Sequence, residues 1–308
     1  MRIIFMGTPT FGVPTLNLLH QQGHTLLVVC QPSKPVGRKR VLTPPPIAQR
    51  ALELNLPLYQ PEKISTLYET LKAFDPELIV TAAYGQYVPT KILALPSIDA
   101  INLHGSLLPK YRGGAPIQRA IMDGETTTGI SIMRMVKTLD GGPVFLKHEV
   151  PITAEDTSET LFEKLSNLAP VALMDAWEQI VTKTPPVPQD DTQATFAPNL
   201  TREEEVLQFT QPNTHVDAHI RAFYPSPATY TTFEGKRLKV FKAIPLETAH
   251  SATPGTIIKL HDQGPVVACK TGALVLCDLQ LEGKKRLLGE DFLKGIDASR
   301  LLGAKFGA

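Results

Sequence analysis

The sequence predicts an α/β protein with a mostly parallel sheet, followed by a smaller all-β domain at its C-terminal end. Three observations lead to this fold class. Apolar segments of strand length alternate with helical segments along residues 2–181, a stretch rich in proline and charge spans 182–205, and short β-prone segments follow it. A chain of 308 residues also exceeds the usual size of a single hydrophobic core, so we expect two domains.

The first half of the chain opens as strand, helix and strand. Residues 2–7, RIIFMG, form a short apolar segment that stops at a glycine. The next segment, VPTLNLLHQQGH, has apolar residues at helical spacing, and TLLVVCQP after it is again apolar. Further strands are predicted at 77–85, 100–105 and 129–136, with a helix before the first of these. Such alternation indicates a mostly parallel sheet with helices on both faces.

The strongest helix prediction covers residues 154–181, where apolar residues recur at helical spacing. Asp156 and Glu159 match the spacing of a capping box at its start. The next stretch lacks a sustained apolar period, which is typical of a linker, and the β-prone segments beyond it suggest a small barrel or sandwich. We therefore predict an N-terminal domain, a linker and a C-terminal domain over residues 1–184, 185–205 and 206–308.

Composition argues against several classes of protein. Cys30, Cys269 and Cys277 are odd in number, widely spaced and without histidines at metal spacing, so we expect neither a disulfide framework nor a metal site. No segment approaches the roughly 18 apolar residues that a membrane span needs. The N-terminus lacks a basic region followed by a long apolar run. We therefore expect a cytoplasmic protein with no membrane association, and we expect a monomer.

Charge is unevenly distributed, although the net charge is only +1. Residues 1–52 contain no Asp or Glu, and residues 206–308 hold 13 Lys and Arg against nine Asp and Glu. Within 34–40 there are four cations, Lys34, Arg38, Lys39 and Arg40. Local basic patches of this kind fit a polyanionic partner, although a loop of this composition is ordinarily only a solvated surface segment.

Two polar residues interrupt the apolar strand in the segment INLHGSLLPKYRGGAP, which begins at residue 101. Successive strand side chains point to opposite faces, so Asn102 and His104 share one face at the end of the strand. Ligands bind at that edge in open α/β sheets. A lone buried histidine is more often a core residue, and Asp140 in the later TLDGGPV is by itself an ordinary turn residue.

If these three side chains lie close together, they limit the type of reaction that the site can catalyse. His104 can accept and return a proton near neutral pH, Asn102 can donate a hydrogen bond to a developing oxyanion, and Asp140 can orient the imidazole. No serine or cysteine is needed as a nucleophile. Direct acyl transfer to an amine, through a tetrahedral intermediate, suits this set.

The segments NLHGSLLPKYRGGAPIQRAI and LDGGPV together resemble the catalytic core of the folate-dependent formyltransferases. The resemblance implies a Rossmann-like formyltransferase domain, an OB-like C-terminal barrel that binds tRNA, and 10-formyltetrahydrofolate as the formyl donor. It assigns catalytic roles to Asn102, His104 and Asp140. It assigns the folate site to Ser106, Leu107, Leu108 and Pro109, with Gln86, Tyr87 and Val88 near the pterin.

Within this family the chain is most similar to members that formylate the α-amine of methionine on initiator tRNA. The opening RIIFMGTPTFGVPTL and the segments CQPSKPVGRKRVLTPPPI and IRAFYPSPATY carry this similarity. It implies that the basic loop at 33–46 contacts the acceptor arm, through Lys34, Arg38, Lys39 and Arg40. The chain departs from the family at Val136 and Thr138, before Asp140.

Two other functions are left open by the residues. One is formyl transfer to a small amine, such as a nucleotide or an amino sugar. The other is RNA binding without catalysis.

Overall fold

The computed structural model describes residues 1–37 and 40–307. The chain divides into two compact units, each of which is described by itself. The first unit contains residues 1–116, 127–151 and 162–198, and the second contains residues 117–126, 152–161 and 199–308.

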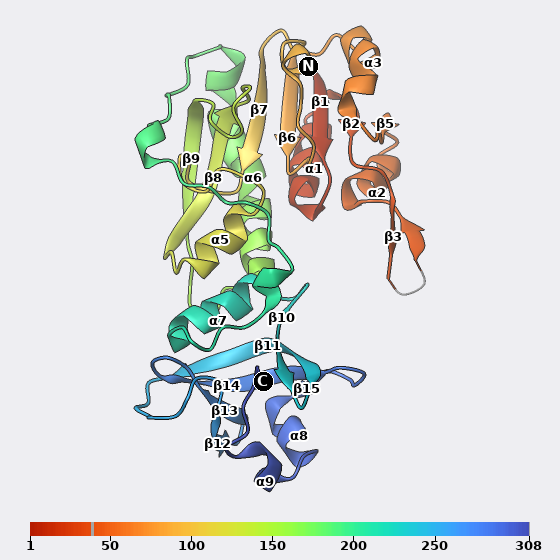
Figure 1. The fold of residues 1–308 in the computed structure, drawn as a ribbon. Helices are drawn as coiled ribbons and strands as arrows, with labels where there is room; N and C mark the ends of the chain where they lie inside the picture. The colour runs from red at the N-terminus through yellow and green to blue at the C-terminus, as the bar shows by residue number, and fades with distance from the viewer. Residues whose placement is uncertain (38–39, 308) are drawn as a thin grey trace. The chain divides into compact units, whose positions relative to one another are not determined.

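A seven-stranded sheet forms the centre of the first unit, in the order β5-β2-β1-β6-β7-β8-β9 (Figure 1). The first five of these strands, from β5 to β7, are parallel to one another, whereas β8 is antiparallel to both β7 and β9. The predicted mostly parallel sheet is therefore confirmed. The strands are β1 (Arg2–Gly7), β2 (Thr25–Val29), β5 (Leu58–Tyr59), β6 (Leu78–Ala82), β7 (Asp99–His104), β8 (Thr127–Arg134) and β9 (Val144–Pro151).

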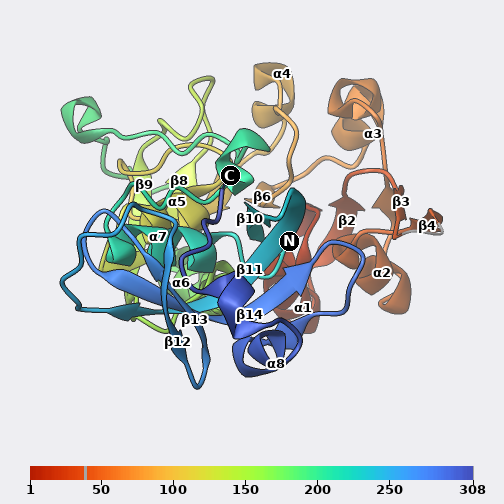
Figure 2. The same ribbon diagram turned by 60° about the horizontal axis from the view of Figure 1, so that its bottom comes forward.

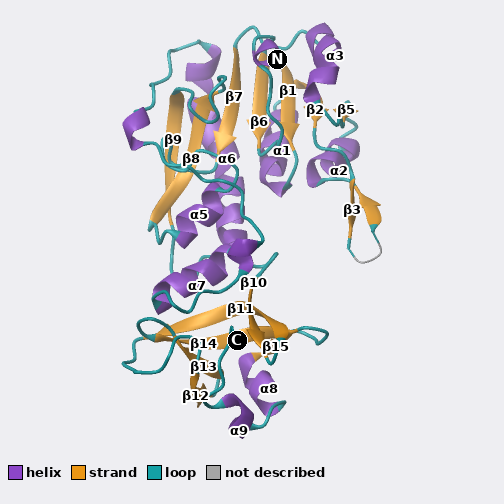
Figure 3. Cartoon of the chain, in the orientation of Figure 1, coloured by secondary structure: helices purple, strands orange, loops and turns teal. Residues whose placement is uncertain are grey.

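Helices lie beside this sheet because the central strands are apolar on both faces. Figure 3 shows α1 and α6 next to the orange strands. Ile4, Met6 and Ile79 belong to one buried cluster, which holds the centre of the sheet. The helices are α1 (Val13–Gln21), α2 (Pro46–Glu53), α3 (Tyr68–Ala73), α4 (Thr90–Leu93) and α6 (Ser158–Val181), with 3-10 turns at Thr10–Gly12, Ile64–Leu67 and Asp191–Gln193.

The start of α6 differs from the predicted capping box by one residue. Thr157 and Thr160 form the reciprocal pair, because each hydroxyl accepts a hydrogen bond from the other residue's backbone N–H. Asp156 instead accepts hydrogen bonds from the backbone N–H and the hydroxyl of Thr153. The carboxylate therefore closes the preceding turn.

A two-stranded hairpin of the first unit follows β2 in the chain. It consists of β3 (Lys34–Val36) and β4 (Val41–Thr43), and it extends away from the seven-stranded sheet in both views (Figures 1 and 2). Lys34 and Arg40 are exposed on it. The predicted tRNA contacts Arg38 and Lys39 lie outside the described residues.

The second unit contains an antiparallel sheet in the order β10-β11-β14-β13-β12, with β15 paired to β14. This confirms the predicted β domain, which also carries short helices. The strands are β10 (Thr229–Phe233), β11 (Lys236–Leu246), β12 (Ile257–His261), β13 (Gly264–Ala268), β14 (Ala273–Leu281) and β15 (Leu287–Leu288). The helices are α5 (Pro116–Met122), α7 (Asn213–Ala222), α8 (Gly289–Lys294) and α9 (Ala298–Leu301), with a 3-10 turn at Glu203–Glu205.

Aromatic packing holds the core of this unit, where the ring of Phe233 meets the rings of Phe292 and Phe306. Arg286 lies over the ring of Phe241 and donates two hydrogen bonds to the carboxylate of Asp278. Its positive charge is therefore paired within the unit. None of the helices in the described part of the chain is long and apolar enough to span a membrane.

Candidate active site

Asn102 and His104 lie at the carboxyl end of β7, two positions apart and therefore on the same face of the strand. The parallel strand β6 lies on one side of β7, and β8 lies on the other. Only 5% of His104 is exposed, whereas Asn102 is half-buried. The imidazole is thus shielded from bulk water beside an amide that is accessible to a ligand.

The amide of Asn102 is oriented by Thr81 on the neighbouring strand. The two residues are register partners between β6 and β7, and the Thr81 hydroxyl donates a hydrogen bond of 2.7 Å to Asn102 Oδ1. Because Asn102 Oδ1 accepts this hydrogen bond, the amide nitrogen Nδ2 points away from Thr81 and can donate to a ligand. Thr81 is not among the predicted site residues, although its hydroxyl inside the apolar run LIVTA was a signal.

Both ring nitrogens of His104 are placed by contacts. Nε2 lies 2.9 Å from the backbone oxygen of Tyr111, and because a carbonyl only accepts, Nε2 carries the hydrogen. Nδ1 therefore faces Asp140, whose Oδ2 is 3.7 Å away. At this distance the two groups interact electrostatically without a direct hydrogen bond. Tyr111 has φ of 61°, a strained conformation for a bulky side chain, and this aims its carbonyl at the ring.

Asp140 reaches His104 from a loop that begins at the other end of β7. The end of β8 at Arg134 pairs with Ile101, three residues before His104, because the two strands are antiparallel. The loop must therefore turn back toward the carboxyl end of β7. There Asp140 Oδ2 accepts a hydrogen bond of 2.9 Å from the backbone N–H of Gly113.

Two glycines allow the backbones around Asp140 to approach closely. A Cβ at Gly142 would lie 1.9 Å from the backbone oxygen of Arg134. A Cβ at Gly113 would lie 2.5 Å from the backbone oxygen of Ala197, and φ of Gly113 is 129°. The loop that follows β7 and the loop that carries Asp140 therefore each require a glycine at one position, because any side chain there would clash with backbone atoms.

Gln189 fixes the backbone of the Asp140 loop. Its Nε2 donates to the backbone oxygens of Asp140, at 2.8 Å, and Gly142, at 2.6 Å. Its Oε1 accepts hydrogen bonds from the guanidinium of Arg112, which is itself paired with Asp191. Gln189 lies in the predicted linker, and its contact with the Asp140 loop was not predicted because a proline-rich stretch without apolar period gives no signal for it.

The predicted folate-binding segment Ser106 to Pro109 is held rigidly by Ser131 on β8. The Ser131 hydroxyl accepts from the backbone N–H of Leu108 and donates to the backbone oxygen of Ser106. The Ser106 hydroxyl donates to the backbone oxygen of Lys110. Leu108 is fully buried, and Leu107 and Pro109 are half-buried, so the segment forms a fixed wall beside His104.

The predicted pterin contacts Gln86, Tyr87 and Val88 differ from one another in their surroundings. The Gln86 amide bridges the backbone of Ile64 and Pro61. Tyr87 is 59% exposed, and Val88 packs in the core of the first unit. Any contact of Gln86 or Val88 with a ligand would therefore be made mainly through the backbone.

Two buried groups near these strands are held in their neutral forms. Burial raises the pKa of the Cys30 thiol to about 11. Burial also raises the pKa of the Tyr84 phenol above its ordinary value, with a smaller contribution from Cys30. Both groups stay protonated at neutral pH, so neither is prepared to act as a nucleophile or a base.

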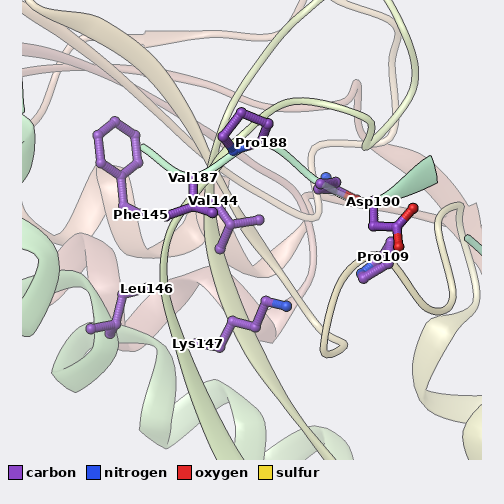
Figure 4. A pocket seen from close by; sticks show the side chains of 9 residues that line it. Pro109, Val144, Phe145, Leu146, Lys147, Val187, Pro188 and Asp190 are labelled. Carbon is purple, nitrogen blue, oxygen red and sulfur yellow. The ribbon is translucent and has the colours of Figure 1, made fainter. Parts of the chain in front are cut away.

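A cavity of about 370 Å³ lies along the start of β9, next to the candidate site. Figure 4 shows Val187 and Pro188 near Phe145, with Asp190 and Pro109 on the other side. Its lining includes Pro109 and Gln189 but none of Asn102, His104 and Asp140. The chemistry of those three residues, rather than the size of the cavity, defines the site. Within residues 1–37 and 40–307, no group of three or more His, Cys, Asp or Glu is placed to hold a metal ion.

The mostly parallel sheet carries an amide, an imidazole and a carboxylate near its carboxyl edge, and group-transfer enzymes use such groups for proton transfer and oxyanion stabilisation. Family models identify the kind of transferase. Residues 1–177 match the formyl transferase model, and residues 199–297 match the model of the formyl transferase C-terminal domain. The chain therefore belongs to the formyl transferase family, whose members use a folate-derived formyl donor.

Comparison with individual proteins shows which enzymes of the family the chain resembles. The methionyl-tRNA formyltransferase of Staphylococcus aureus strain Newman is 46% identical over 308 residues, which cover 99% of each chain. The chain accordingly falls among the methionyl-tRNA formyltransferases.

Solved structures share the fold at lower identity. HypX from Aquifex aeolicus, solved in complex with tetrahydrofolic acid, is 17% identical with a TM-score of 0.65. The match covers 99% of this chain, which spans about half of HypX, 48%. The sugar 3N-formyl transferase WlaRD, solved with dTDP and 5-N-formyl-THF, has a TM-score of 0.67 at 15% identity over 92% of this chain and 99% of its own.

Proposed function

We propose that this enzyme transfers the formyl group of 10-formyltetrahydrofolate to the α-amine of methionine on initiator tRNA, with Asn102, His104 and Asp140 as its catalytic residues. Formylation of methionyl-tRNA agrees with the 46% identity along the whole chain. The observation that carries the residue assignment is the 3.7 Å approach of Asp140 to His104, on the strand face that also bears Asn102.

The proposed mechanism has one addition and one elimination. The neutral amine attacks the formyl carbon, and a C–N bond forms while the carbonyl oxygen becomes an oxyanion. Asn102 Nδ2 donates a hydrogen bond to this oxyanion, and protonated His104 stabilises its charge. Asp140 holds His104 in place, and the proton lost by the attacking amine reaches the folate nitrogen as the C–N bond to the donor breaks.

The remaining predicted sites complete this proposal. We assign residues 1–184 to the catalytic domain, 185–205 to the linker and 206–308 to an OB-like domain that binds tRNA. The wall formed by Ser106, Leu107, Leu108 and Pro109 would contact the folate, and the backbone near Gln86, Tyr87 and Val88 would meet the pterin. Lys34, Arg38, Lys39 and Arg40 would bind phosphates of the acceptor arm.

The decisive experiment incubates the purified protein with 10-formyltetrahydrofolate and methionyl initiator tRNA and measures formylmethionine. Parallel reactions contain uncharged initiator tRNA, a nucleotide amine or an amino sugar. Formylation of the charged tRNA alone supports the proposal. Preferential formylation of a small amine would favour the second function, and failure to formylate any amine would favour RNA binding without catalysis.

The basic hairpin should make tRNA recognition sensitive to salt. Each phosphate contact contributes about 0.7 to 0.9 to the slope of log affinity against log salt concentration. Replacing both Lys34 and Arg40 by Ala should therefore raise KM for methionyl-tRNA and lower this slope by about 1 to 2. Steady-state kinetics at several salt concentrations measure both effects.

The matched control is Lys72→Ala, which removes an exposed cation from α3 of the same unit. It should leave KM for tRNA and its salt dependence unchanged. A hairpin variant with the same salt slope as the unmodified protein would remove Lys34 and Arg40 from tRNA binding.

Thr81 should affect turnover through Asn102. Thr81→Val keeps the shape of the side chain but removes the hydroxyl that binds Asn102 Oδ1. The loss of one orienting hydrogen bond is worth about 0.5 to 1.5 kcal/mol, so we expect kcat to fall about two- to thirteen-fold. Thr81→Ser keeps the donor and should retain most of the activity, whereas equal kcat in Thr81→Val would show that Asn102 needs no such partner.

A further inference from the structure

We propose that Gln189 is a positioning residue that sets the geometry of Asp140 against His104. The proposal rests on the catalytic role of Asp140 proposed above. Gln189 lies in the segment 187–197, which the sequence predicts as linker, and this segment packs back onto the first unit.

The Asp140 loop needs an external constraint because of the sheet topology. It leaves β8 at the level of Ile101 and turns back toward His104. Asp140 has φ of 48°, in the left-handed region, which aspartate adopts more readily than most residues other than glycine. The Gln189 amide nitrogen donates to two carbonyls of this loop, those of Asp140 and Gly142, which flank Gly141.

The Gln189 amide has a single orientation that satisfies its neighbours. The carbonyls of Asp140 and Gly142 only accept, and the guanidinium of Arg112 only donates. Exchanging the oxygen and nitrogen of the amide would therefore break every one of these bonds. Arg112 is only 5% exposed, so the anchor behind Gln189 is itself fixed.

The same segment also holds the partner of the other imidazole nitrogen. Thr195 Oγ1 accepts a hydrogen bond of 2.9 Å from the backbone N–H of Tyr111, whose carbonyl binds His104 Nε2. Residues 187–197 therefore constrain both neighbours of the imidazole, through Gln189 on the Asp140 side and Thr195 on the Tyr111 side. A displacement of about 1 Å at such a site can cost about a hundred-fold in rate.

Two substitutions separate positioning from general stability. Gln189→Glu keeps an oxygen for Arg112 but removes both donors to the loop, and Gln189→Met removes all of these bonds. We expect both to lower kcat about ten- to hundred-fold, with little change in KM for the formyl donor. Gln193→Met, an exposed glutamine in the same segment, should retain normal kcat.

A double-mutant cycle tests whether Gln189 affects kcat through Asp140. If Gln189 acts through Asp140, adding Gln189→Met to Asp140→Asn should lower kcat by less than about two-fold further. Additive losses would overturn the proposal, as would normal kcat in both Gln189 variants.

Hydrogen exchange gives a readout that is independent of activity. The backbone N–H of Gly113, which binds the Asp140 carboxylate, should exchange faster in Gln189→Glu and Gln189→Met. Unchanged exchange of this N–H would overturn the proposal. Failure of the proposed function would appear differently, as normal kcat in Asp140→Asn or as an unmodified protein that formylates nothing.

Discussion

Asn102→Ala is expected to lower kcat about a hundred- to a thousand-fold, which is the usual loss when one oxyanion donor is removed. Asn102 Nδ2 would donate to the oxygen of the formyl carbon only once negative charge develops there. The interaction is therefore stronger in the transition state than in the ground state. Binding of the formyl donor should change little, because the ground-state carbonyl gains less from the same hydrogen bond.

Asn102→Asp is the informative companion variant. It keeps the size of the side chain but replaces the donor by a carboxylate, so activity should fall at least as far as in Asn102→Ala. Single-turnover kinetics with saturating substrates measure the chemical step, and equilibrium titration measures binding of the formyl donor. A variant with near-normal turnover would exclude Asn102 from the mechanism.

Local periodicity accounts for the parts of the structure that the sequence predicts well. Apolar runs such as RIIFMG and LIVTA become buried strands, and the two-residue period of a strand places Asn102 and His104 on one face. Both inferences need only neighbouring residues. The direction of β8 depends on distant pairing, so the sequence did not indicate that the Asp140 loop starts from the far end of β7.

Residues that act through polar contacts between distant segments were missed for the same reason. Thr81 contacts Asn102 because β6 and β7 pair in one particular register. Gln189 lies in an irregular segment whose contacts are hydrogen bonds and β-bridges to the first unit, such as the bridge between Val144 and Val187. Apolar periodicity detects hydrophobic packing and does not detect segments held by backbone hydrogen bonds.

Asp140→Asn is expected to lower kcat about a hundred- to ten-thousand-fold, because His104 depends on Asp140 and a histidine that transfers protons contributes a factor in this range. The asparagine keeps an oxygen that can accept from the N–H of Gly113, so the loop should retain its conformation. The substitution instead removes the negative charge 3.7 Å from His104 Nδ1, and with it the electrostatic interaction between Asp140 and the imidazole.

The exposed turn residue Asp262 supplies the control, since Asp262→Asn also removes one carboxylate but lies in the second unit, on the turn between β12 and β13. Its kcat should be normal. Hydrogen exchange at Gly113 should also be unchanged in Asp140→Asn, in contrast to the Gln189 variants, because charge rather than loop geometry is altered. A loss of activity accompanied by faster exchange at Gly113 would mean that Asp140 matters for the fold of the loop and not for the charge beside His104.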